Sequence, residues 1–220
     1  MWLIQIGLLE TVFMKHRFLV LLVPVAMAVT SGCQTAVPIK ASALPRISEP
    51  KPQSLCVLKE ATDARKNKSD HVGRHTFTVF MIPTISVESR EPLGKEVGKV
   101  FTEALTQSGY EVRQVAALDE ADGPVLVIQV DSFRNYLFSW LWPLGLTGGR
   151  AKLTPYVFGS DGKVLWKGEP CVAWGGCPSA AYMAGFETTV KMEMSSIMRD
   201  VVVQFRTPAF LNAVSPASGE

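Results

Sequence analysis

The sequence predicts an α/β (α+β) fold, a two-layer sandwich in which two helices cover one face of a mixed or mostly antiparallel sheet of about five strands. Two patterns lead to this prediction. Apolar residues alternate with polar ones in several short segments, as in half-buried strands, and in two longer segments they recur every three to four residues, as in amphipathic helices. The segments follow the order β-α-β-β-β-β-α, which favours helices packed together on one face of the sheet.

The two helices are predicted at residues 93–108 and 183–205. Pro92 and Gly109 suit the start and the end of the first helix, and Thr207-Pro208 should end the second. Gly94 and Gly98 predict close packing of the first helix against the sheet. The buried faces should hold Leu93, Val97, Val100, Phe101, Ala104, Leu105 and Ser108 in the first helix, and Met183, Phe186, Val190, Met194, Ile197, Met198, Val201 and Phe205 in the second.

The five strands are predicted at residues 75–82, 110–115, 125–133, 150–158 and 163–174. Pro83 should end the first strand, because proline lacks the N–H that a ladder needs. A Gly-Ser-Asp-Gly turn at residues 159–162 should join the last two strands into a hairpin. In the third strand, the face predicted to meet the helices holds Leu126, Ile128, Val130 and Ser132. The folded domain is thus expected at residues 75–207, followed by a disordered tail at 208–220.

The N-terminal segment has the pattern of a secretion signal. Residues 14–17 are Met-Lys-His-Arg, residues 18–29 are apolar, and Thr30-Ser31-Gly32-Cys33 follows. The apolar run is too short to span a membrane, and it contains Pro24. We therefore expect a signal peptide at residues 14–32. Residues 1–13 are apolar and lack basic side chains, so we expect them to be an extension upstream of the true start at Met14.

Residues 33–74 are rich in Pro, Ser, Ala and Lys. Such a composition cannot bury a core, and it predicts a flexible tether between Cys33 and the domain. The short apolar patch at residues 55–58 is the exception, because it could add an edge strand to the sheet.

The cysteines point to one disulfide. In an oxidising compartment Cys171 and Cys177 could close a short loop, and the alternative is that Cys56 pairs with one of them. No Cys-x-x-Cys pair or His-x-x-x-His accompanies these residues, so no metal site is expected.

The segment between the third and fourth predicted strands is unusually aromatic and apolar for a hairpin loop. Its notable residues are Tyr136, Phe138, Trp140, Leu141, Trp142 and Leu144. One interpretation is that this loop folds back to cap the open end of the sandwich. The other is that it contacts a protein partner or a membrane surface.

Composition and motifs exclude several classes of function. The formal net charge is only +2 and no basic cluster is evident, so nucleic acid is not an expected partner. The chain contains no Gly-x-Ser-x-Gly, P-loop, Gly-x-Gly-x-x-Gly or His-Glu-x-x-His motif. We therefore expect a protein that is not an enzyme and that carries no cofactor.

Thr30-Ser31-Gly32-Cys33 resembles the lipobox of bacterial lipoproteins. The resemblance implies cleavage between Gly32 and Cys33 and a diacylglycerol on the Cys33 thiol. Gln34 agrees with sorting to the outer membrane, because the inner-membrane retention signal of enteric bacteria is Asp at that position.

Three segments, VGKVFTEAL (residues 97–105), SGY (108–110) and DGKVLW (161–166), belong to a pattern that resembles Gram-negative periplasmic lipoproteins. These share the small α/β sandwich of the TolB N-terminal domain and of the lipoproteins of curli secretion and Pel polysaccharide export. The resemblance implies a non-enzymatic accessory protein that often assembles into complexes.

The expected function is that of a lipid-anchored outer-membrane protein whose domain faces the periplasm. It would act by contact with an envelope protein or with a second copy of itself, in an envelope assembly or export system. The alternative is a lipoprotein that binds or transports lipid or lipopolysaccharide through the same aromatic loop.

The lipid anchor can be tested by metabolic labelling. Cells grown with radiolabelled palmitate should incorporate label into the protein, and Cys33→Ala should abolish incorporation because it removes the acylated thiol. Cys56→Ala is the control and should keep the label. Label persisting in Cys33→Ala would overturn the assignment.

Overall fold

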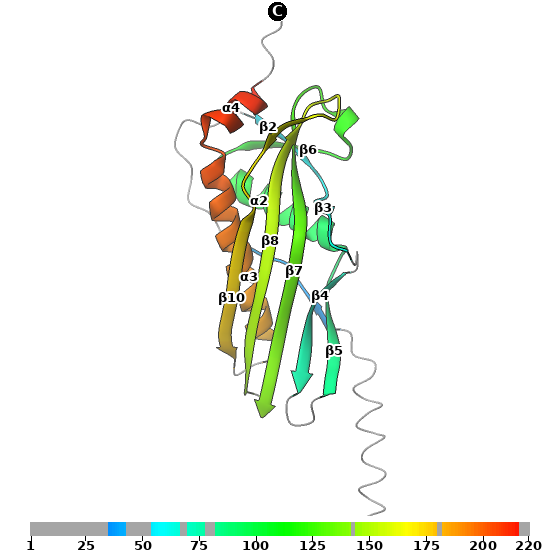
Figure 1. The fold of residues 1–220 in the computed structure, drawn as a ribbon, viewed down its shortest axis with the longest axis vertical. Helices are drawn as coiled ribbons and strands as arrows, with labels where there is room; N and C mark the ends of the chain where they lie inside the picture. The colour runs from blue at the N-terminus through cyan, green and yellow to red at the C-terminus, as the bar shows by residue number, and fades with distance from the viewer. Residues whose placement is uncertain are drawn as a thin grey trace, which may run out of the picture.

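The computed structural model describes residues 35–42, 54–66, 70–77, 82–141, 144–179 and 182–215. Within them, ten strands form one curled mixed sheet, and α-helices pack against it (Figure 1). The predicted α/β class is confirmed, whereas the expectation of five strands is wrong. The elements are β1 (Thr35–Val37), β2 (Ser54–Leu58), β3 (Thr62–Asp63), β4 (His71–Phe77), β5 (Ile82–Ser89), α2 (Leu93–Gln107), β6 (Glu111–Val115), η1 (Leu118–Glu120), β7 (Val125–Leu141), β8 (Leu144–Phe158), β9 (Val164–Lys167), β10 (Cys171–Ser179), α3 (Tyr182–Gln204) and α4 (Pro208–Val214).

Strand β7 lies at the centre of the sheet. One edge of β7 pairs antiparallel with β8 along almost its whole length. The other edge pairs in parallel with three short strands in succession, β2, β3 and β4. Strand β6 then flanks β2, β5 and β1 extend the sheet beyond β4, and β9 and β10 both pair with β8.

The sheet begins much earlier in the chain than residue 75. Strands β1, β2 and β3, and the first residues of β4, lie in the segment for which composition predicts a flexible tether. Strand β2 also differs from the predicted edge strand, because it lies between β6 and β7. Leu55 and Val57 are buried there, so a very short apolar segment suffices once partners flank it on both sides.

The stretch after β1 is fastened to both long helices. The backbone N–H of Ile39 donates to the buried carboxylate of Glu96 on α2 at 2.7 Å. The N–H of Ser42 donates to the Ser195 hydroxyl on α3, also at 2.7 Å. Ile39 itself is buried in the main core, so the described part of this segment belongs to the domain.

Proline does not end a strand at residue 83 as predicted. Strands β4 and β5 form an antiparallel pair, and Pro83 lies inside β5 opposite Thr76. The outer edge of β5 pairs with β1 only at Val87–Ser89. No described strand pairs with the outer edge of β5 at Pro83. Proline is tolerated at such an edge, because the N–H that it lacks is not needed for a ladder there.

Helix α2 follows the prediction closely. Its predicted apolar face is buried, and Gly109 ends it with a φ of 93°. A Cβ built on Gly94 would lie 2.4 Å from the carbonyl oxygen of Ala61, and one on Gly98 would lie 2.3 Å from that of Lys59. These glycines thus let α2 approach the segment between β2 and β3, where the N–H of Ala61 donates to the Gly94 carbonyl at 2.8 Å.

Helix α3 is the second predicted helix, and it covers the same sheet face as α2. Residues of both helices share one core cluster with Leu126, Ile128 and Val130 of β7. In the described part of the chain, no helix combines the length and the apolarity that crossing a membrane requires.

The predicted tail begins with a further helix. Thr207 caps α4, and Phe210 is fully buried. The Phe210 ring stacks on Phe205 with centroids 4.2 Å apart, and it meets Trp166 edge-on at 5.0 Å. Residues 208–215 therefore belong to the domain, and residues 216–220 lie outside the described part of the chain.

The faces of β7 exchange partway along the strand. The ladder with β8 shifts between Val130 and Ser132, so Asp131 is an extra residue. Such a bulge reverses the alternation beyond it. The prediction that Leu126, Ile128 and Val130 face the helices is therefore correct, whereas the same prediction for Ser132 is wrong. From Phe133 onward, the odd-numbered residues of β7 are the buried ones.

The last predicted strand is two strands, because Gly168-Glu169-Pro170 separates β9 from β10. The turn before β9 is as predicted. Gly162 has a φ of 76°, and its N–H donates to the Gly159 carbonyl at 2.9 Å.

In Gly98→Ala the added methyl group has no space beside the Lys59 carbonyl, and such overpacking costs about 1–3 kcal/mol. Alanine is favoured over glycine inside a helix by roughly 1 kcal/mol, so the protein should be destabilised by a net amount of up to about 2 kcal/mol. Urea unfolding measures the change. Gly123→Ala, where nothing lies within 4 Å of the new methyl group, is the control and should be close to neutral.

Candidate binding face

The aromatic segment forms the end of a long hairpin, because β7 extends to Leu141 and β8 starts at Leu144. Tyr136 and Phe138 lie on the sheet face that points away from the helices, where they are 48% and 38% exposed. Their rings meet edge to face with centroids 5.1 Å apart. The side chains of Trp140, Leu141, Trp142 and Leu144 lie outside the described residues.

Four neighbouring strands, β4, β7, β8 and β10, present this outer face. Strand pairing places its side chains in rows across the sheet. One row holds Arg134, Arg150 and Trp174, the next holds Arg74, Tyr136, Gly148 and Gly176, and a third holds Thr76, Phe138, Leu146 and Pro178. We call these three rows the outer face.

The outer face carries unneutralised positive charge. Arg134 and Arg150 are directly opposite each other, an arrangement that costs free energy when nothing neutralises it. Within the described residues, no carboxylate forms an ion pair with Arg74, Arg134 or Arg150. The Arg150 guanidinium lies 4.9 Å from the ring centroid of Trp174, which is 73% exposed. Cations and aromatic rings are therefore both available to a ligand.

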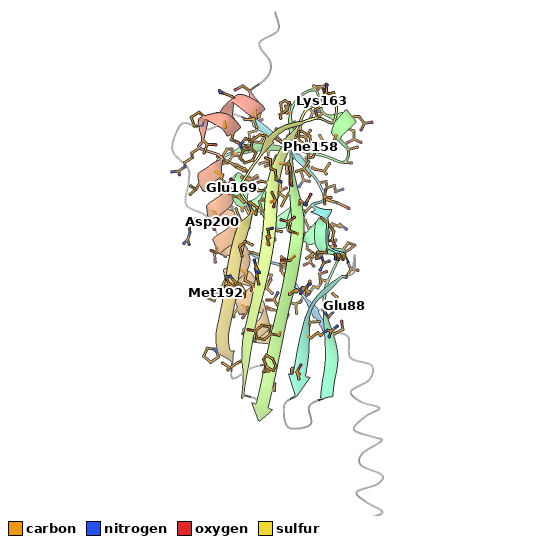
Figure 2. The ribbon with its side chains drawn as sticks, viewed as in Figure 1. Glu88, Phe158, Lys163, Glu169, Met192 and Asp200 are labelled. Atoms are coloured by element: carbon orange, nitrogen blue, oxygen red, sulfur yellow. The ribbon has the colours of Figure 1, made fainter. Side chains whose placement is uncertain are left out.

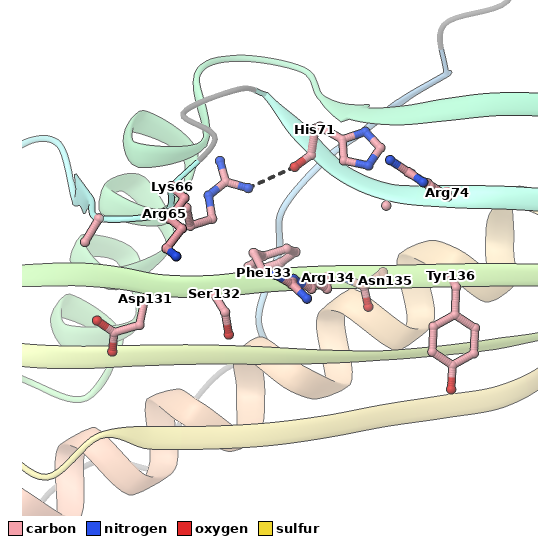
Figure 3. Close-up of a pocket in the computed structure, with 12 residues that line it drawn as sticks. Arg65, Lys66, His71, Arg74, Asp131, Ser132, Phe133, Arg134, Asn135 and Tyr136 are labelled. Carbon is pink, nitrogen blue, oxygen red and sulfur yellow. Dashed lines mark hydrogen bonds between the residues drawn. The ribbon is translucent and has the colours of Figure 1, made fainter.

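A hollow of about 790 Å³ adjoins the outer face between the β3–β4 segment and β7 (Figure 3). Arg65 forms a fixed part of its wall: it is bound to both carboxylate oxygens of Asp63 and donates to the His71 carbonyl at 2.9 Å. Most of the lining residues are polar or charged: Ala64, Arg65, Lys66, His71, Gly73, Arg74, Asp131, Ser132, Phe133, Arg134, Asn135 and Tyr136.

Two further groups in this hollow add no positive charge. Asp131 accepts hydrogen bonds from Thr154 at 2.5 Å and Gln129 at 2.7 Å, and it lies 4.0 Å from the Lys152 ammonium. Burial, and then the charge of Arg74, lower the pKa of His71, which keeps its imidazole neutral at neutral pH. Because Arg65 is paired with Asp63, the positive charge of the hollow comes mainly from Lys66, Arg74 and Arg134.

A carboxyl group is buried directly behind the outer face. Glu193 of α3 has no exposed surface, and it approaches the sheet where Gly149 and Gly175 leave room. A Cβ on Gly149 would lie 2.6 Å from Glu193 Oε1. Burial raises the pKa of Glu193 to about 8, although hydrogen bonds from the Gly175 N–H and from Asn135 oppose the shift.

The Asn135 amide faces the Glu193 carboxyl group. In the orientation that satisfies its neighbours, Nδ2 lies 3.1 and 3.2 Å from the two carboxyl oxygens and can donate to them. Asn135 therefore connects the central strand of the sheet to α3.

Further polar side chains are buried between the hairpin and α3. His75 Nε2 lies 3.0 Å from the Ser139 hydroxyl, and burial lowers the pKa of His75 to about 4. The Thr147 hydroxyl lies 2.6 Å from that of Thr189. All four of these side chains are at most 5% exposed. We call His75, Asn135, Ser139, Thr147, Thr189 and Glu193 the polar seam.

The predicted disulfide is wrong. Cys56, Cys171 and Cys177 are all free thiols. Cys171 and Cys177 lie on the same extended strand, β10, so six residue steps separate them by about 20 Å, whereas a disulfide needs Cα atoms roughly 6 Å apart. Burial also raises the pKa of Cys171 to about 11, so this thiol stays protonated.

The sequence contains two signals of the polar seam that an analysis of hydrophobic periodicity alone does not detect. Glu193 falls seven residues after Phe186, on the apolar face of α3, where a carboxyl group contradicts the pattern. Gly148-Gly149 and Gly175-Gly176 lie inside strands, and paired glycines there indicate close approach of another element. Neither signal identifies the arginines of the outer face, because their facing depends on the bulge at Asp131.

The sequence matches no protein-family model and no curated protein. Among solved structures it is similar to protein XCC0632 of Xanthomonas campestris, assigned to family DUF330, at 15% identity over 77% of this chain and 92% of the other, with a TM-score of 0.47. A putative neuraminyllactose-binding hemagglutinin homolog from Helicobacter pylori is similar at 12% identity over 78% and 95%, with a TM-score of 0.45. Lipoprotein GNA1162 of Neisseria meningitidis is similar at 14% identity over 69% and 96%, with a TM-score of 0.32.

Sequence identities of 15% or less and TM-scores below 0.5 do not show that these proteins share a function with this chain. The expected resemblance to the TolB N-terminal domain and to the lipoproteins of curli secretion and Pel export finds no support among these structures.

The buried Glu193 predicts a dependence of stability on pH. The folded protein keeps the Glu193 proton up to about pH 8, whereas the unfolded chain releases it near 4.5, so the free energy of unfolding should fall as pH rises between these values. His75 has the opposite effect only below pH 6.5, because its folded pKa is lowered to about 4. Between pH 6.5 and 8 the fall due to Glu193 should be about 2 kcal/mol.

Glu193→Gln removes the titrating group and should abolish most of this fall, as measured by urea unfolding at pH 6.5 and pH 8. Glu103→Gln, on the exposed side of α2, should retain it. An unchanged pH dependence in Glu193→Gln would contradict the assignment of a protonated Glu193.

Proposed function

We propose that the protein is a lipid-anchored envelope protein that acts by binding, and that its outer face binds an acidic surface of a protein partner. The observation that carries the proposal is the set of three arginines, Arg74, Arg134 and Arg150, that have no carboxylate partner among the described residues. Repulsion between Arg134 and Arg150 is relieved when acidic groups approach them, so this face favours an anionic partner.

The chemistry of the outer face suits binding better than catalysis. Arginine keeps its proton at every physiological pH, so it holds an anion without exchanging protons. Exposed Tyr136 and Trp174 provide the rigid aromatic anchors that dominate many protein interfaces. We therefore propose a protein without enzymatic activity of its own.

The location follows from the N-terminal sequence. The predicted secretion signal and lipobox support an anchor at Cys33 on a membrane surface, and Gln34 favours the outer membrane with the domain in the periplasm. The lipid anchor would be very close to the domain, because β1 starts at Thr35, only two residues after Cys33.

The alternative of a lipid or lipopolysaccharide carrier is less well supported by the hollow. Acyl chains need apolar walls, whereas this hollow is lined mainly by charged and polar side chains. A protein partner uses both the cations and the exposed rings, so we favour it.

Charge reversal tests the proposal. A photo-crosslinking amino acid at Thr76, beside Phe138, should capture a partner in growing cells, and Arg134→Glu/Arg150→Glu should reduce the crosslinked product at least about tenfold because like charges then meet at the contact. The measurement is immunoblotting, with mass spectrometry to identify the partner.

Arg199→Glu/Arg206→Glu is the matched control, because it makes the same change in net charge at exposed positions on and just after α3. This variant should crosslink like the parent. Equal crosslinking by parent and Arg134→Glu/Arg150→Glu, or equal loss in both double variants, would contradict the proposed contact.

A further inference from the structure

A glycine trough crosses the sheet face that α3 covers. One row of paired residues on the neighbouring strands β4, β7, β8 and β10 consists of Gly73, Asn135, Gly149 and Gly175. Glycine inside a strand leaves space for the close approach of another element, and here it occupies three of the four positions. The element that uses this space is α3, which lies against β8 and β10 (Figure 1).

The first half of α3 fills the trough with Phe186, Thr189 and Glu193, which are spaced three or four residues apart. A Cβ on Gly73 would lie 2.5 Å from the Phe186 ring. A Cβ on Gly175 would lie 2.8 Å from the Thr189 carbonyl oxygen and 2.9 Å from Cγ of Glu193. Because Glu193 has no exposed surface, its carboxyl group reaches water only if this part of the helix moves away from the strands.

No positive charge compensates Glu193 in the trough. Among the described residues, none forms an ion pair with it. Burial raises its pKa, and the two groups that oppose the shift, the Gly175 N–H and the Asn135 amide, are both neutral donors. Ionisation with the helix in place therefore costs free energy.

The other groups that face Glu193 do not change this result. One turn away on α3 lie the uncharged residues Thr189, Val190, Ser196 and Ile197. The titratable side chains that face α3 from the described part of the sheet are His75, Cys171 and Cys177. His75 and Cys171 are uncharged at neutral pH because burial lowers the pKa of the first to about 4 and raises that of the second to about 11. None of the three contributes to the pKa of Glu193.

The two halves of α3 are held to the sheet differently. Met192 lies in the first half and Asp200 in the second, and both are labelled in Figure 2. The end of the second half is fastened by Gln204, which exchanges hydrogen bonds of 2.7 and 3.0 Å with the backbone of Glu169. Among the described side chains, the buried apolar ones are Phe186 and Val190 in the first half, and Met194, Ile197, Met198, Val201, Val202 and Phe205 in the second half and just after it. The first half can therefore open while this larger core stays intact.

We infer that residues 184–193 form a flap that leaves the glycine trough as rising pH removes the proton from Glu193, while residues 194–204 stay packed on the sheet. The flap is a pH-responsive device built into α3, and it depends neither on the lipid anchor nor on the arginines of the outer face.

The sign of the pH dependence follows from the two environments of Glu193. With the flap in place its pKa is about 8, whereas in water a glutamate has its ordinary value of 4.5. Opening is therefore coupled to loss of the proton between these two values, so the open state gains as pH rises from 4.5 to 8. Above about pH 8 Glu193 is ionised in both states, and the gain should level off.

Cys177 reports the position of the flap. Its Sγ lies 3.5 Å from the Gly185 carbonyl oxygen and 3.7 Å from the Thr189 hydroxyl, and both of these residues belong to the flap. Opening removes these contacts and admits a thiol reagent. Cys171 is the internal reference, because its Sγ lies 3.1 Å from Nε2 of Gln204 in the second half of α3.

Thiol labelling at pH 6.5 and pH 8 tests the inference. The full chain carrying Cys33→Ala is treated with iodoacetamide, and mass spectrometry measures the rate at each cysteine. Since pH itself changes thiol reactivity, the increase in the Cys177 rate is divided by the increase in a chain that also carries Glu193→Gln. This quotient should be about tenfold or more, and Cys171 should stay protected. Glu187→Gln, which removes another carboxyl group from the same half of α3, should behave like the parent.

Hydrogen exchange provides a second measurement that leaves Glu193 unchanged. After correction for intrinsic exchange rates, protection of the amides of residues 186–193 should fall about tenfold or more between pH 6.5 and pH 8. Protection of residues 198–204 should stay constant. This measurement decides the case even if Glu193→Gln does not fold.

Three results would overturn the inference. The first is a labelling quotient close to one, because Glu193 would then not control the flap. The second is a parallel increase in the labelling of Cys177 and Cys171. The third is an equal loss of amide protection in both halves of α3, since this would show that the whole domain opens.

Discussion

The extra residue at Asp131 determines what the second half of the long hairpin presents to its surroundings. Before it, even-numbered residues of β7 meet the helices; after it, odd-numbered residues do. Arg134, Tyr136 and Phe138 consequently point outward, and Asn135 and Ser139 point toward α3. Hydrogen bonds from Gln129 and Thr154 hold the Asp131 carboxylate at the bulge. This one extra residue therefore determines which side chains form the basic outer face and which form the polar seam behind it.

Glycine on two strands makes this arrangement possible. Gly149 and Gly175 lie side by side in the sheet, and without side chains they leave a notch into which Glu193 reaches from α3. Gly148 has a related role on the outer face, where the Tyr136 ring covers it. Aromatic residues often shield a strand glycine in this way. The helix, the hairpin and the outer face are therefore coupled through positions that tolerate no larger residue.

Both long helices could be predicted because their periodicity extends over many turns: Val97 to Leu105 and Phe186 to Phe205 are buried as expected. The short strands could not be predicted in this way. Thr35–Val37 and Thr62–Asp63 are too short to show a hydrophobic period, and their extended conformation depends on pairing with strands far away in sequence. Composition predicted a tether at residues 33–74, in which only the short apolar patch at residues 55–58 indicated a strand. The hairpin was predicted too short because the bulge interrupts its alternation, and the outer face depends on strand pairing that no single segment encodes.

The parallel pairing of β1 with β5 has a mechanical consequence. A force applied to the chain upstream of Thr35 would act along β1, so the hydrogen bonds to Val87–Ser89 would be loaded together in shear rather than broken one after another. Behind β1, the bonds from Ile39 to Glu96 and from Ser42 to Ser195 would pass the load to both long helices. The start of β1 is thus reinforced against a pull on the chain upstream of it, where the proposed lipid anchor lies.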